Sequence, residues 1–160
     1  MPQRETRSYT GGTIRHLCAS LSMLVCPAMI DRSSIPPSLL ALIEGDPTTS
    51  MEAAKAIIGH KISVDYKLLG EIAAEKSLQT WSRIAAIYTV GFSGKNDFSP
   101  TLRNILADDS DDAIVRAHAA EALGNLQDRA AIALLRNILS RKPPPELSES
   151  CSYALDELAA

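Results

Sequence analysis

Aromatic residues make up only 4% of this 160-residue sequence, and its apolar content is mostly Ala, Leu and Ile. Sheets favour aromatic and β-branched side chains, so this scarcity argues against a β fold and favours close packing of helices. The total apolar fraction of 46% is ordinary for a globular protein. It excludes wholesale disorder and allows one compact domain or one short solenoid with a real core.

Cysteine is also scarce, with an odd count of three and no C-x-x-C pair: Cys18, Cys26 and Cys151. This excludes a disulfide framework or a zinc cage and favours a reducing compartment. Cys151 falls on the apolar stripe of an expected helix, where a cysteine acts as a small buried hydrophobe.

Neither an excess of positive charge nor a long apolar run is present. The formal net charge is -3, which gives no basic footprint for nucleic acid. No apolar run approaches the roughly 20 residues that span a bilayer. We therefore expect a cytoplasmic protein that binds neither nucleic acid nor membrane.

Residues 1–33 differ in composition from the rest of the chain, because a basic start precedes a moderately apolar run over 17–30. We interpret them as a tail and a short helix near 13–26 that caps the first repeat, since the end units of solenoids need a cover. Two alternatives stay open. The segment also has the outline of a secretory signal, and a start codon placed too far upstream, with Met23 or Met29 as the true beginning, would give the same pattern.

The rest of the chain repeats with a period of 33 residues. The pentapeptide Leu-Arg-Asn-Ile-Leu stands at 102–106 and again at 135–139, and the same step carries Arg83 onto Arg116 and Gly91 onto Gly124. A period in the thirties is typical of a solenoid of stacked helical pairs.

This period predicts two sets of helices. Four windows place mostly Leu and Ile at positions i, i+1, i+4 and i+5 of one helical face: 35–40, 68–73, 101–106 and 134–139. Second helices carry an apolar stripe over 115–126 and 147–158. The equivalent stripe over 82–93 is weaker, and other residues are expected to take over part of its packing there: Trp81, Ile84, Ile87 and Tyr88.

The predicted fold is therefore all-α, an α-solenoid of about four stacked antiparallel helix pairs over 34–160. Pro143-Pro144-Pro145 is expected to break the chain before the last helix. Three of the predicted capping sites lie in the second half of the chain: Asp97 or Ser99 before Pro100, the last aspartates of 108–112, and Asp128.

The most regular stretch, 111–141, resembles the HEAT-repeat signature, and most closely the subtype named in phycobilisome lyases. The resemblance is carried by an ordered set of residues: Asp112, Val115-Arg116, Ala119-Ala120, Ala122-Leu123-Gly124, Asp128 and Leu135-x-x-x-Leu139. It is weaker over 80–110 and 146–159 and weakest over 35–76. It implies a HEAT-like superhelix whose second helices line a concave surface that docks another macromolecule, and it implies no particular reaction.

The arginine of the signature has an expected structural role. Arg83 and Arg116 lie one period apart, so stacked repeats can place them in a ladder beside the acidic turn that holds Asp111 and Asp112. A guanidinium can bind carboxylates and free carbonyls at helix ends through several donors. Direct recognition of a partner is the alternative role.

Sequence motifs for catalysis are absent: there is no nucleophile elbow, P-loop, dinucleotide fingerprint or zinc His-x-x-x-His pair. His118 and Glu121 share a helical face and could form an acid–base pair, although solvated surface residues explain them better. Glu71 and Glu75, one turn apart, are typical of an exposed helix. The sequence predicts no catalytic, cofactor-binding or metal-binding residue.

The function predicted from these features is a non-catalytic adaptor that binds another protein. Its contacts are expected from exposed residues of the second helices: Arg83, Tyr88, Arg116, His118 and Glu121. Two alternatives remain, a lyase or lyase-like chaperone for a prosthetic group and a small immunity or regulatory partner protein.

Overall fold

The computed structural model describes residues 36–59, 62 and 64–160, and this part of the chain folds into helices without a strand. Eight α-helices and two 3₁₀ turns succeed one another in it: α1 Pro37–Glu44, α2 Pro47–Gly59, α3 Tyr66–Ala74, α4 Thr80–Gly91, η2 Asn96–Phe98, α5 Ser99–Ala107, α6 Ala113–Asn125, η3 Arg129–Ala131, α7 Ile132–Ser140 and α8 Pro145–Ala159.

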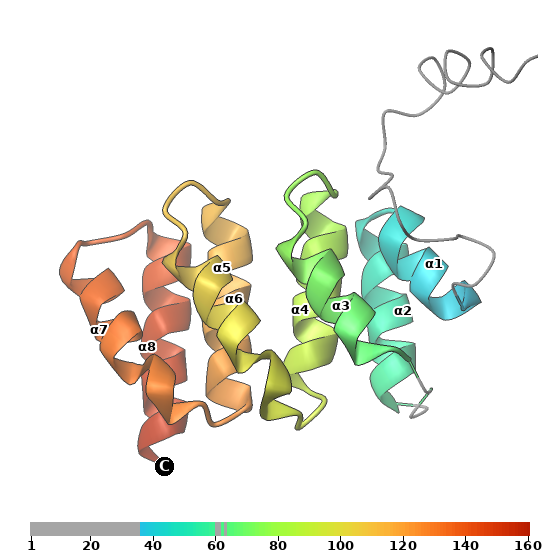
Figure 1. Cartoon of the computed structure of the whole chain (residues 1–160). Helices are drawn as coiled ribbons and strands as arrows, with labels where there is room; N and C mark the ends of the chain where they lie inside the picture. Colours follow the sequence, from blue (N-terminus) through green and yellow to red (C-terminus); the bar gives the residue numbers. More distant parts are fainter. Residues whose placement is uncertain (1–35, 60–61, 63) are drawn as a thin grey trace, which may run out of the picture.

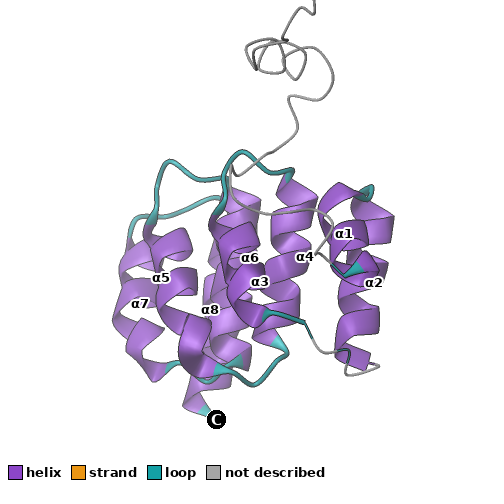
Figure 2. Cartoon of the chain, turned by 45° about the vertical axis from the view of Figure 1, so that its right-hand side comes forward, coloured by secondary structure: helices purple, strands orange, loops and turns teal. Residues whose placement is uncertain are grey.

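The helices form four consecutive pairs that stack side by side, as Figure 1 shows. Within each pair the first helix packs on the second, and the second helices α2, α4, α6 and α8 pack on one another in turn. The first helices form the other layer, and the turned view in Figure 2 shows the two layers together. The predicted α-solenoid of about four helix pairs is confirmed.

The 33-residue step along the chain corresponds to equivalent positions in the first-helix layer. Leu39 of α1 has Ile72, Ile105 and Ile138 as its counterparts, and all four side chains are buried. Three leucines at another equivalent position are buried as well: Leu69, Leu102 and Leu135. Their burial removes apolar surface from water and so stabilises each pair through the hydrophobic effect.

The second helix of the second pair, α4, buries the weaker stripe expected from the sequence. Its polar residues Ser82 and Thr89 occupy the predicted stripe and are fully buried. The Ser82 hydroxyl donates to the Ile43 carbonyl at 2.8 Å, and the Thr89 hydroxyl donates to the Ala85 carbonyl at 2.8 Å. A buried hydroxyl is tolerated when it is hydrogen-bonded. The stripe is therefore buried despite its polar residues. The expected contribution of neighbouring residues is confirmed in part, because Ile87 is fully buried and the half-buried Ile84 and Tyr88 pack against the core.

Two of the three predicted capping sites are wrong. A 3₁₀ turn, Asn96–Phe98, leads directly into α5, so Ser99 is already helical and no side chain caps this helix. Asp128 does not cap either, because its carboxylate pairs with Arg103.

The third predicted site is confirmed. The Asp112 carboxylate accepts a hydrogen bond from the Ile114 amide at 2.9 Å and caps α6. The predicted break at Pro143-Pro144-Pro145 is also confirmed, since α8 begins at Pro145.

Two glycines one period apart allow the second helices to approach closely. A Cβ atom built on Gly91 would lie 2.9 Å from the Cβ atom of Ala122, and one built on Gly124 would lie 2.9 Å from the Cα atom of Ala154. Real Cβ atoms do not approach other atoms so closely. The glycine of the repeat signature therefore sets the distance between neighbouring second helices.

The expectations for residues 1–33, including the helix near 13–26 and the secretory signal, lie outside the described residues. Within the described part, no helix is both long enough and apolar enough to cross a membrane.

Candidate functional site

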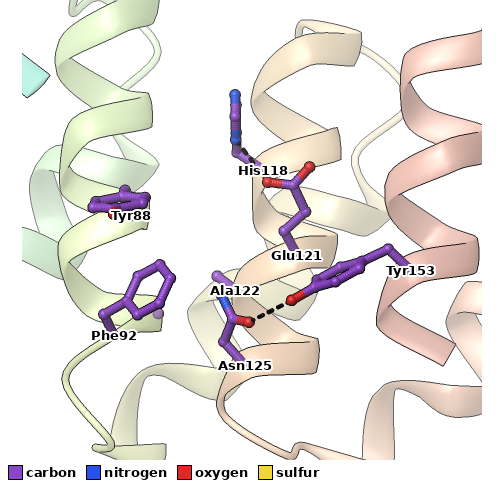
Figure 3. Close-up of a pocket in the computed structure, with 8 residues that line it drawn as sticks. Tyr88, Phe92, His118, Glu121, Ala122, Asn125 and Tyr153 are labelled. Atoms are coloured by element: carbon purple, nitrogen blue, oxygen red, sulfur yellow. Dashed lines mark hydrogen bonds and ion pairs between the residues drawn. The ribbon is translucent and has the colours of Figure 1, made fainter. Parts of the chain in front are cut away.

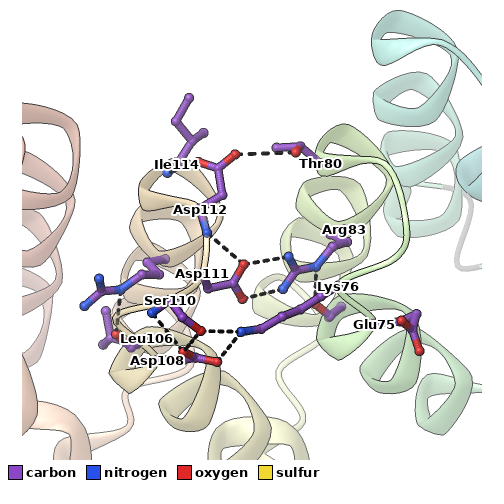
Figure 4. A network of polar contacts seen from close by, with 12 residues as sticks. Glu75, Lys76, Thr80, Arg83, Leu106, Asp108, Ser110, Asp111, Asp112 and Ile114 are labelled. Atoms are coloured by element: carbon purple, nitrogen blue, oxygen red, sulfur yellow. Dashed lines mark hydrogen bonds and ion pairs between the residues drawn. The ribbon is translucent and has the colours of Figure 1, made fainter.

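Arg83 forms the first rung of the predicted arginine ladder, shown in Figure 4. Its Nε donates to the Ala73 carbonyl at the end of α3, at 3.0 Å. Its two terminal nitrogens donate to the two carboxylate oxygens of Asp111 at 2.7 and 2.6 Å. Both side chains are 4% exposed, and the hydrogen bond from Arg83 holds the pKa of Asp111 below its ordinary value.

Arg116 repeats this arrangement one period later. Its Nε donates to the Leu106 carbonyl at the end of α5, at 3.0 Å, and its Nη2 donates to the Asp109 carboxylate at 2.7 Å. Arg141 donates to the other oxygen of the Asp109 carboxylate at 3.0 Å. The ladder is thus confirmed beside the predicted acidic turn. Its carboxylates are Asp111 and Asp109, and Asp112 caps α6 instead.

The ladder corrects the predicted set of partner-binding residues. Arg83 and Arg116 are buried and committed to helix-end carbonyls and aspartates, so they are not exposed contacts. The sequence pattern thus predicted the ladder correctly. It was wrong to count Arg83 and Arg116 also among the exposed residues that contact a partner.

The other three candidates, Tyr88, His118 and Glu121, do lie together. They line an open recess of about 220 Å³ between α4, α6 and α8, which Figure 3 shows. Gly91 and Ala122, the pair in close contact, also contribute to its lining.

Glu121 is the centre of a small polar network in this recess. The His118 Nδ1 and a Glu121 carboxylate oxygen lie 3.1 Å apart, and the Ser150 hydroxyl donates to the other oxygen at 2.7 Å. The hydrogen bond with His118, and then the one from Ser150, lower the pKa of Glu121. The carboxylate is therefore ionised at neutral pH.

Aromatic rings form the walls of the recess. The rings of Tyr88 and Phe92 lie 4.7 Å apart, centroid to centroid, and are tilted by 49°. On the other side, the Tyr153 hydroxyl donates to the Asn125 side-chain oxygen at 3.2 Å. Phe92 is 51% exposed and Tyr153 is 45% exposed, so both rings are open to a ligand.

Sequence reasoning missed Phe92, Asn125, Ser150 and Tyr153, although the repeat contained the signal. Steps of 33 and 32 residues carry Tyr88 onto Glu121 and Glu121 onto Tyr153. The same 33-residue step carries Phe92 onto Asn125. Applying the period to the outer face of the second helices, as well as to their buried stripe, would have brought these residues together.

Among the residues that the structure describes, neither the acids nor Cys151 provide a second site. Within the described residues, no group of three or more His, Cys, Asp or Glu lies close enough to hold a metal ion. Glu71 lies 4.0 Å from Lys67 in an exposed pair, and Glu75 accepts from the Ser77 hydroxyl. Burial raises the pKa of the Cys151 thiol to about 11, so this thiol stays protonated at neutral pH.

This burial predicts slow alkylation of Cys151. We expect iodoacetamide at pH 8 to leave Cys151 largely unmodified in the native protein, because the thiolate is the reactive form and the side chain is inaccessible. Unfolding in urea should restore reaction at the rate of a free thiol. Peptide mass spectrometry follows this site separately from the other cysteines, and equal rates in the native and unfolded protein would contradict the buried assignment.

Comparison with known families decides what kind of repeat this is. The family described as HEAT repeats matches residues 66–156, which runs from the start of α3 almost to the end of α8. The chain belongs to the HEAT-repeat family. The resemblance to HEAT repeats that the signature indicated is confirmed at this level.

The curated relatives of this HEAT-repeat chain are named for an enzyme. Deoxyhypusine hydroxylase of Kluyveromyces lactis is 35% identical over 71 residues, which is 44% of this chain and 22% of that protein. The Saccharomyces cerevisiae protein of the same name is 32% identical over a segment with the same coverage. The Aspergillus clavatus protein is 25% identical over 146 residues, which is 82% of this chain and 44% of that protein.

The chain therefore spans less than half the length of these relatives. No solved structure matches it.

These relatives overturn the predicted function. A non-catalytic adaptor is contradicted, because the similar proteins bear the name of a hydroxylase. The finer resemblance to phycobilisome lyases is not supported either. The physical reason is that the residues of the signature, such as Arg116 and Gly124, hold the repeats together and carry no information about the reaction.

Proposed function

We propose that this HEAT-repeat protein acts in the hydroxylation of deoxyhypusine. The observation that carries the proposal is the similarity to the Aspergillus clavatus deoxyhypusine hydroxylase, which extends over 82% of this chain. Shorter segments are more similar still to the yeast proteins of that name.

The recess between α4, α6 and α8 is where we place substrate contact. It lies within the segment that matches the family, and it combines an ionised carboxylate with accessible aromatic rings. Its volume of about 220 Å³ is below the ~300–1,000 Å³ typical of pockets for drug-sized ligands. A site of this size suits one amino-acid side chain, which we infer is presented by another protein.

An extract from Saccharomyces cerevisiae cells that lack their own deoxyhypusine hydroxylase, kept under air, provides the test. It supplies dioxygen, one atom of which enters the product, and a two-electron reductant that converts the other atom to water. We expect that adding the purified chain converts a deoxyhypusine-containing peptide into a product heavier by one oxygen atom, as seen by mass spectrometry. The same peptide with lysine at that position should stay unchanged.

A heat-denatured sample of the chain is the control for adventitious oxidation. Equal conversion with native and denatured protein, or no conversion with either, would contradict the proposed function.

A further inference from the structure

We propose that the recess formed by Tyr88, Phe92, Glu121 and Tyr153 binds a protonated primary amine on an alkyl chain. The chemistry of the recess carries this inference. Only the assignment of that amine to deoxyhypusine rests on the proposed function.

The charge of the recess selects a cation. Glu121 provides its carboxylate, and no lysine or arginine is among the described residues that line it. His118 contacts one oxygen of this carboxylate through its Nδ1. The Glu121 side chain is 39% exposed, and a carboxylate offers about four acceptor positions, of which His118 and Ser150 use two. Acceptor capacity thus remains for an incoming ammonium group.

The aromatic rings favour an alkylammonium over a simple metal cation. Three of the seven aromatic residues in the whole sequence gather at this recess. The face of an aromatic ring attracts an ammonium group, and its apolar surface covers the attached methylenes. The same protein already shows such a contact elsewhere, because the Lys95 ammonium lies 4.0 Å from the centre of the Tyr66 ring.

The repeat explains how the rings come to flank the acid. Tyr88, Glu121 and Tyr153 occupy equivalent positions on three successive second helices, so stacking places the carboxylate between two aromatic residues. Figure 3 shows Tyr88 of α4 and Phe92, the residue directly after α4, on one side of the α6 residue Glu121, with Tyr153 of α8 on the other side. An anion would be repelled by Glu121, and a neutral apolar ligand would leave the carboxylate without a new partner.

The test is a titration of the full chain with n-butylammonium, monitored through backbone amide shifts in ¹H–¹⁵N NMR spectra. We expect saturable shifts centred on 88–92, 118–125 and 150–153. The isosteric neutral probe n-butanol should bind at least tenfold more weakly. The substitution Glu121→Gln should also weaken n-butylammonium binding at least tenfold, because it keeps the shape of the side chain and removes its charge.

Glu71→Gln is the matched control, since Glu71 is an exposed carboxylate on α3 outside the recess. It should leave binding unchanged, and the melting temperature of both variants should confirm that they are folded. The substitution Phe92→Leu keeps Glu121 and removes one aromatic face, and it should weaken binding severalfold. Equal binding of n-butanol, unchanged binding by Glu121→Gln, or shifts centred elsewhere would each overturn the inference.

The two proposals fail in different ways. Amine binding at the recess without oxygen transfer in the yeast extract would refute the proposed function and leave the amine site standing. Oxygen transfer by a chain that shows no saturable n-butylammonium shifts would refute the amine site and leave the function standing.

Discussion

Replacing Arg83 with Met should lower the free energy of unfolding by about 3–5 kcal/mol, as is typical when one partner of a buried ion pair is removed. Arg83 binds Asp111 through two hydrogen bonds while both side chains are almost wholly buried. The substitution leaves the Asp111 carboxylate in the interior without its cation, and it removes a donor from the Ala73 carbonyl. Urea denaturation monitored by circular dichroism measures the change.

The control for Arg83 is Lys67→Met. Lys67 and Glu71 are spaced i,i+4 on α3, and their side chains are 83% and 56% exposed. An exposed pair of this kind contributes about 0.3–0.5 kcal/mol. Similar losses in the two variants would show that the ladder is not a structural element.

The Arg83–Asp111 pair also predicts how the free energy of unfolding depends on pH. The pKa of Asp111 in the folded state lies below the ordinary value of 3.8, chiefly because Arg83 donates hydrogen bonds to it. Its contribution to stability is therefore fully present above about pH 4 and is lost as the pH falls through the folded-state pKa. The Arg83→Met variant should lose less stability than the wild type over this acidic range.

Replacing Gly124 with Leu should destabilise the protein by about 2–3 kcal/mol, within the range for overpacking a close contact. The Cβ atom alone would lie 2.9 Å from the Cα atom of Ala154, which is backbone and cannot rotate away. The helices α6 and α8 would have to separate, and their mutual packing would weaken along its length.

The matched control is Gly59→Leu at the last residue of α2. A Cβ atom at Gly59 meets no atom within 4 Å, so only small effects are expected there, and helix propensity favours the replacement. If both variants unfold at the same urea concentration, close approach at Gly124 does not set the spacing of the repeats.

The sequence was sufficient to predict the parts of the fold that repeat. Apolar residues at equal steps, such as Leu102 and Leu135, indicate a buried helix face, because equivalent buried positions in every repeat require apolar side chains. The ladder was predictable for the same reason, since Arg83 and Arg116 bind equivalent helix ends.

Local details were less predictable because they depend on contacts that are distant in sequence. Asp128 has the residue type and the position of a helix N-cap. Its carboxylate instead binds Arg103 from the preceding repeat. Ser82 breaks the apolar pattern, but its hydroxyl reaches a carbonyl of α1.

The residues of the candidate site were predictable only in part. The sequence predicted Tyr88, His118 and Glu121 as contacts. It did not indicate Phe92 and Tyr153, because they lie on the exposed face of the second helices, where no apolar pattern marks them. The reaction could not be predicted from the repeat, because the signature residues are structural. The relatives, not the motif, corrected the expected function.

A crystal structure of the full chain with bound n-butylammonium tests the central claim most directly, namely that the repeat builds an amine site from equivalent positions on three second helices. We expect the ammonium nitrogen within hydrogen-bond distance of the Glu121 carboxylate and the alkyl chain against Tyr88 and Phe92. An amine bound elsewhere, or rings of Tyr88 and Tyr153 that do not flank Glu121, would contradict it.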